Sequence, residues 1–63
     1  MDREKLRDRL NLINNEIEIY KTNVIEHVKK EEMVPATCDL LIMRDLKEQQ
    51  LLLKNLLESE DKQ

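Results

Sequence analysis

Three residues of types that bind metal ions or activate nucleophiles lie around the middle of the chain: His27, Cys38 and Asp39. One histidine and one cysteine supply two ligands, whereas zinc sites use four protein groups, or three and a water. A cysteine nucleophile needs an oxyanion hole, and the chain has no glycine from which to build a glycine-rich turn. We therefore predict no catalytic residue, no metal site and no cofactor. We interpret His27 as a capping or packing residue and Cys38 as a small buried thiol.

Two amides, Gln49 and Gln50, interrupt an apolar stripe where leucine would continue it. We expect them to lie level with Tyr20 and to form a polar layer in the middle of the core. A buried amide in a coiled coil fixes the register and the oligomeric state at some loss of stability. In the alternative interpretation, one glutamine faces solvent and the other reaches the rim. The sequence leaves open which of the two points inward.

Basic residues cluster near the start of the chain and again before its middle, at Arg3, Lys5, Arg7, Arg9, Lys29 and Lys30. Acidic residues are interleaved with them, which is typical of a solvated helix face. The formal net charge is -3, so no general attraction to nucleic acid is expected.

The composition indicates a small helical protein. Of the 63 residues, 40% are charged and 2% aromatic, and the apolar residues recur periodically, which argues against disorder. No apolar run approaches the roughly 20 residues needed to span a bilayer. With one cysteine and no apolar signal segment, we expect a reducing, cytoplasmic setting and no membrane.

Pro35 divides the chain into two helices because proline cannot continue a helix through its interior. We predict a single all-α domain over 1–63, an antiparallel helical hairpin with helix 1 at about 2–32, a turn at about 33–36 and helix 2 at about 37–58. Asp2 would cap the first helix, and Thr37 the second if it begins after the proline. In this register Ile17 lies level with Leu53, and Ile13 with Leu56 and Leu57.

Apolar residues at four-three spacing mark the inner face of the first helix: Leu6, Leu10, Ile13, Ile17, Tyr20 and Val24. This spacing is typical of a coiled-coil seam. Other apolar residues lie off the seam, and a single partner helix cannot cover them. We predict that they form an interaction surface, with seven members: Leu12, Ile19, Ile25, Leu40, Leu41, Leu51 and Leu52.

This surplus predicts a homodimer that forms a four-helix bundle, and it also suits a larger protein partner. We interpret the chain as a non-enzymatic interaction module, a small regulatory or adaptor subunit. The architecture resembles Rop-type RNA-organising hairpin dimers, which implies RNA binding as one alternative. It is also similar to small hairpin phosphatases of response regulators, which implies an exposed amide such as Gln49 that positions water. Their Ser-Gln-Glu-Leu-Asp motif is absent, because Ile42 to Leu46 occupy that region as Ile-Met-Arg-Asp-Leu.

Overall fold

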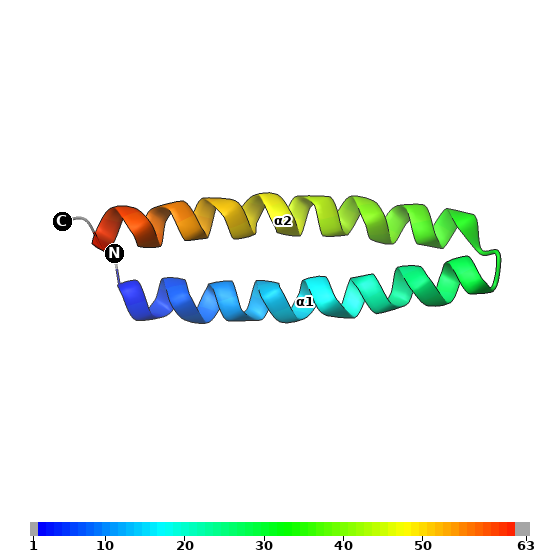
Figure 1. Cartoon of the computed structure of the whole chain (residues 1–63), viewed down its shortest axis with the longest axis horizontal. Coiled ribbons are helices and arrows are strands. Elements are labelled where there is room, and N and C mark those ends of the chain that lie inside the picture. Colours follow the sequence, from blue (N-terminus) through cyan, green and yellow to red (C-terminus); the bar gives the residue numbers. More distant parts are fainter. Residues whose placement is uncertain (1, 62–63) are drawn as a thin grey trace.

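The computed structural model describes residues 2–61, with side chains for residues 2–59. Helix α1 (Arg3–Lys29) and helix α2 (Met33–Asp61) run antiparallel and are joined by a short turn. Figure 1 shows the two helices side by side along their whole length, with the turn at one end. The hairpin is thin, with extents of 49 × 15 × 13 Å. The predicted all-α antiparallel hairpin is confirmed.

The start of α1 follows the predicted capping chemistry. Asp2 adopts an extended backbone as the N-cap, and its Oδ1 accepts a hydrogen bond of 3.0 Å from the Glu4 amide. A short acidic side chain satisfies an amide that has no partner within the helix. The same negative charge is favourable at the positive end of the helix dipole.

The turn lies at 30–32, which is earlier than the expected 33–36. At the end of α1, the Glu31 amide bonds the carbonyl of Val28 and the Glu32 amide bonds that of His27, at 3.0 and 2.8 Å. With Glu31 in the left-handed conformation at φ 61°, these bonds form a Schellman motif. Such a motif usually uses glycine, and this chain has none to mark it.

Pro35 lies inside the first turn of α2 and does not separate the helices. The first amides of a helix have no partner within it, so a residue without an N–H is accommodated there. Thr37 is likewise inside α2, where its hydroxyl donates to the Met33 carbonyl at 2.8 Å. Thr37 is therefore not the N-cap of α2.

The earlier turn changes how the helices pair. Ile13, expected level with Leu56 and Leu57, lines one groove with Leu53. Gln50, expected level with Tyr20, bonds Asn14 instead, which is a displacement of six residues, about 9 Å along α1. The expected pairing of Ile17 with Leu53 is displaced in the same direction. The reason is geometric. When the turn moves toward the N-terminus, each residue of α1 lies opposite an earlier residue of α2.

The core follows the seam predicted for α1. Leu6, Ile13 and Ile17 are buried, while the other three seam residues are half-buried. Ile13 and Ile17 pack with Met43 and Leu46 of α2, and Tyr20, Val24 and Leu53 lie against this cluster. The inner face of α2 alternates three- and four-residue steps through Ala36, Asp39, Met43, Leu46, Gln50, Leu53 and Leu57. Within residues 2–61, neither helix has an apolar stretch long enough to cross a membrane.

Candidate interaction surface

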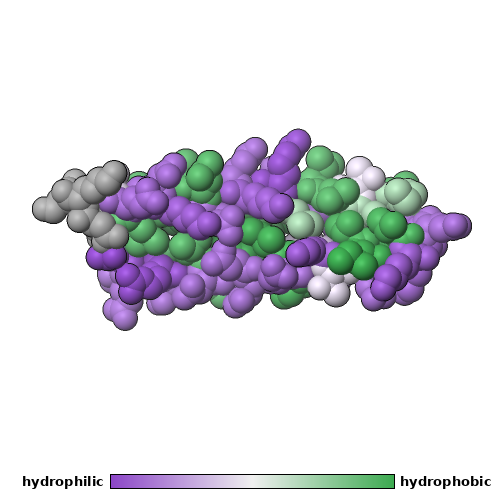
Figure 2. All heavy atoms as spheres, viewed as in Figure 1, coloured by the Kyte–Doolittle hydropathy of each residue, from purple (hydrophilic) through white to green (hydrophobic). Residues whose placement is uncertain are grey.

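Large apolar side chains cover much of the outside of the hairpin. Twelve large apolar residues are exposed in the part of the chain whose side chains are described, and they include the whole predicted interaction surface: Leu12, Ile19, Ile25, Val28, Met33, Val34, Leu40, Leu41, Ile42, Leu51, Leu52 and Leu56. Leu52 is 63% exposed, and Val34, at the start of α2, is 76% exposed. Figure 2 shows apolar residues reaching the surface along the hairpin, with a broad area toward the turn. Whether these residues bind a partner stays a prediction.

One apolar hollow lies along α2 alone. We call it the α2 groove, and it is lined by Leu40, Met43, Arg44, Lys47, Glu48 and Leu51. Its two ends are formed by exposed leucines, and three charged residues line its middle. Its residues are three, four, seven, eight and eleven positions after Leu40, which places them on one face of the helix.

A second hollow lies between the helices. We call it the interhelix groove, and it is lined by Arg9, Ile13, Gln49, Leu52 and Leu53. Leu52 follows Leu51 by one position and so points about 100° away from it around α2. The interhelix groove and the α2 groove therefore open on different sides of α2.

The two glutamines of the predicted polar layer point in different directions. Gln50 is half-buried, and its Nε2 donates a hydrogen bond of 2.6 Å to Oδ1 of Asn14 on α1. Gln49 is exposed and lines the interhelix groove. Tyr20 is half-buried and packs against the apolar cluster. The amide that joins the two helices is thus Gln50, with Asn14 as its partner.

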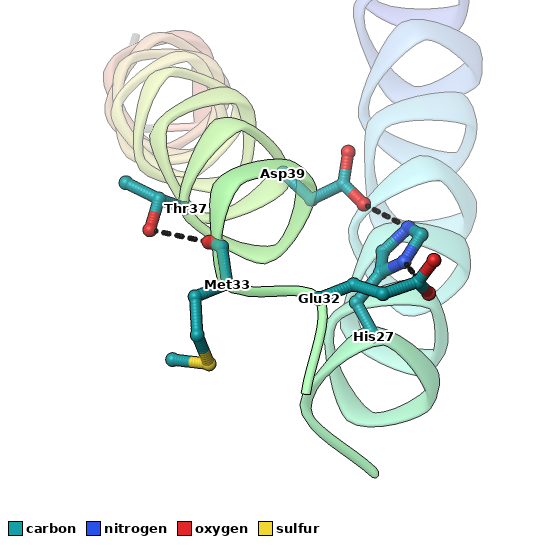
Figure 3. Close-up of polar contacts among 5 residues, drawn as sticks. All are labelled: His27, Glu32, Met33, Thr37 and Asp39. Atoms are coloured by element: carbon teal, nitrogen blue, oxygen red, sulfur yellow. Dashed lines mark hydrogen bonds and ion pairs between the residues drawn. The ribbon is translucent and has the colours of Figure 1, made fainter. Parts of the chain in front are cut away.

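A histidine and two carboxylates meet at the turn, as Figure 3 shows. Nδ1 of His27 lies 3.1 Å from Oε1 of Glu32, and its Nε2 lies 3.5 Å from Oδ2 of Asp39. The ring therefore connects α1, the turn and α2. Only the contact with Glu32 has hydrogen-bond geometry, and Nδ1 donates in it when that nitrogen carries the proton. The contact with Asp39 is an ion pair when the ring is protonated.

Cys38 does not join His27 and Asp39. It is exposed and lines a hollow at the start of α2 with Met33, Val34 and Thr37. The prediction of a buried thiol is therefore wrong, because the next residue, Asp39, takes the inward position of α2. Across residues 2–61, no three His, Cys, Asp or Glu side chains are grouped so that they could hold a metal ion.

Two polar residues of these contacts were not among the predicted ones, namely Asn14 and Glu32. Asn14 directly follows the seam residue Ile13, so it borders the helix interface in the sequence pattern. The signal for Glu32 is weaker, because its approach to His27 depends on the left-handed residue between them. Comparison of the chain with models of protein families, with curated proteins and with solved structures finds no match.

Proposed function

We propose that this chain is a non-enzymatic protein–protein interaction module that acts through apolar helix faces. The observation that carries the proposal is the imbalance between core and surface. Among residues 2–59, six apolar residues are buried, whereas twelve large apolar residues are exposed. Monomeric soluble proteins rarely leave large continuous apolar patches in water, and such patches mark binding sites.

We propose further that the hairpin dimerises into a four-helix bundle. Folded monomers follow a scaling of surface area with mass that gives about 4300 Å² for a mass of 7.6 kDa. The surface of this chain is 5028 Å². The surplus is similar to the roughly 800 Å² that each partner contributes to a standard interface. A second hairpin packed on one face would remove a surface of this size.

A larger protein partner would bind the hairpin through the same exposed apolar side chains. An amphipathic helix or a hydrophobic groove of the partner would bury leucines that the hairpin leaves exposed. Burial of one leucine-sized side chain contributes about 1.5–3 kcal/mol. Several leucines buried together would be needed to offset the loss of translational and rotational freedom on association, about 4–15 kcal/mol.

Affinity capture with matched variants tests the interaction module. The tagged chain should retain a protein partner after nuclease treatment, because the proposed contact is with protein. Leu52→Glu should lose that partner, since it places a charge on the apolar surface. Asn11→Glu adds the same charge on the exposed, charged face of α1 and should retain it. Association that disappears with nuclease, or that is equal in both variants, would contradict the proposal.

A further inference from the structure

We propose that a second copy of this chain packs along one defined line of α2, antiparallel to the first and related to it by a two-fold axis near Lys47. The line is the α2 seam, made of Cys38, Ile42, Asp45, Gln49, Leu52 and Leu56. This inference rests on the proposed self-association and specifies its face and register.

The α2 seam lies on one face of the helix and is not covered by α1. Its residues alternate four- and three-residue steps, the spacing that keeps side chains aligned along a coiled-coil contact. All six are exposed in the hairpin. Ile42, Leu52 and Leu56 are 40%, 63% and 42% exposed. The seam is thus a second coiled-coil face, distinct from the one that packs on α1.

The seam is chemically complementary to itself when it is reversed about Lys47. Ile42 then lies opposite Leu52 of the second copy, and Cys38 lies opposite Leu56. In the centre, the Asp45 carboxylate faces the Gln49 amide of the second copy. A carboxylate accepts strongly from an amide N–H, so the central polar residues satisfy each other. Isologous dimers require this kind of self-complementarity.

The position of the axis also favours this register. Lys47 is the middle residue of α2, which extends over Met33–Asp61. Two antiparallel α2 helices crossing there overlap along their whole length. Beside the axis, Gln49 and Leu52 line the interhelix groove, which gives side chains of the second copy a hollow to enter.

The α2 groove does not accept a second copy in the same way. Reversal that places Leu40 opposite Leu51 also places Arg44 opposite Lys47 of the other chain. Like charges directly opposite each other are unfavourable, and both would lose solvent in the contact. In the hairpin Arg44 lies 3.7 Å from Asp45, and both side chains are largely exposed. Charge pattern therefore selects the α2 seam over the α2 groove for self-association.

Cross-linking through the single natural cysteine tests the register. In the proposed dimer the two copies of Cys38 lie 18 residues apart along α2, about 27 Å, so the natural chain should not cross-link. Leu56→Cys places a second thiol opposite Cys38 of the other copy. Treatment with a short bismaleimide should convert this variant to a covalent dimer.

Two controls make the result specific. Leu51→Cys introduces a thiol at an exposed leucine of the α2 groove and should remain largely monomeric in a denaturing gel. Leu56→Cys in a Cys38→Ser background removes the partner thiol and should lose the covalent dimer. Sedimentation equilibrium of each uncross-linked variant reports whether the dimer itself is intact.

The possible outcomes separate the two proposals. A covalent dimer that forms with Leu56→Cys but with neither control variant supports the α2 seam. A dimer in sedimentation with no cross-link at Leu56→Cys, or with an equal one at Leu51→Cys, overturns the register and leaves self-association standing. A natural chain and variants that all sediment as helical monomers overturn both self-association and the register.

Discussion

Gln50 of α2 donates a hydrogen bond of 2.6 Å from Nε2 to Oδ1 of Asn14 on α1, a residue 36 positions earlier. Both side chains are half-buried on the inner side of their helices. Shifting one helix by a turn would place each amide against leucine or isoleucine with its polar atoms unpaired. The pair therefore favours one register of the hairpin.

Removing one member of this pair should destabilise the hairpin. Asn14→Leu leaves Gln50 without its acceptor, and we expect the free energy of unfolding to fall by about 1 kcal/mol. The double variant Asn14→Leu/Gln50→Leu removes both polar groups and should raise thermal stability above that of the natural chain. Urea unfolding followed by circular dichroism measures both effects. Additive losses in the double variant would show that the amides do not act as a pair.

Replacing the exposed amide should act on assembly. Gln49→Leu leaves the contacts between α1 and α2 in place, so the helicity of the hairpin should not change. In the proposed dimer it leaves Asp45 of the second copy without its donor, and the set of oligomers should broaden. Analytical ultracentrifugation reports the distribution. A single, discrete dimer identical to that of the natural chain would show that Gln49 is an ordinary surface residue.

Glycine at the turn should stabilise the protein. Glu31 has φ 61°, a conformation that costs a residue with a side chain about 1–2 kcal/mol. Glycine avoids this cost but loses about 0.5–1 kcal/mol through greater freedom in the unfolded chain. We expect Glu31→Gly to raise the free energy of unfolding by up to about 1 kcal/mol. Glu31→Ala removes the same carboxylate and should give no gain, so equal effects of the two variants would contradict the explanation.

Two adjacent apolar residues should behave differently when truncated. Ile13 is 2% exposed in the core, and Ile13→Ala should lower the free energy of unfolding by about 2–4 kcal/mol. Leu12 is 55% exposed, so Leu12→Ala should change the free energy of unfolding of the monomeric chain by about 0.5 kcal/mol or less. Denaturant titration at low protein concentration makes the comparison. Similar losses at both positions would mean that the helix faces are assigned incorrectly.

The helices and their inner faces could be predicted because periodicity depends only on which residues are apolar. The seam from Leu6 to Val24 and the exposed positions of Leu12 and Ile19 follow from it. The turn could not be predicted, since it depends on Glu31 in a left-handed conformation that sequence usually marks with glycine. Pro35 led to the prediction of a later turn, and the predicted register between the two helices was wrong as a result. For this reason the sequence placed Gln50 near Tyr20, whereas its bonded partner is Asn14.

Sedimentation equilibrium of the natural chain at micromolar concentration tests the central claim most directly, with circular dichroism on the same sample. We expect a helical species with twice the 7.6 kDa mass of one chain, because a second hairpin would cover the exposed leucines. A fully helical protein that sediments at the mass of one chain would contradict the claim that the exposed apolar surface serves self-association.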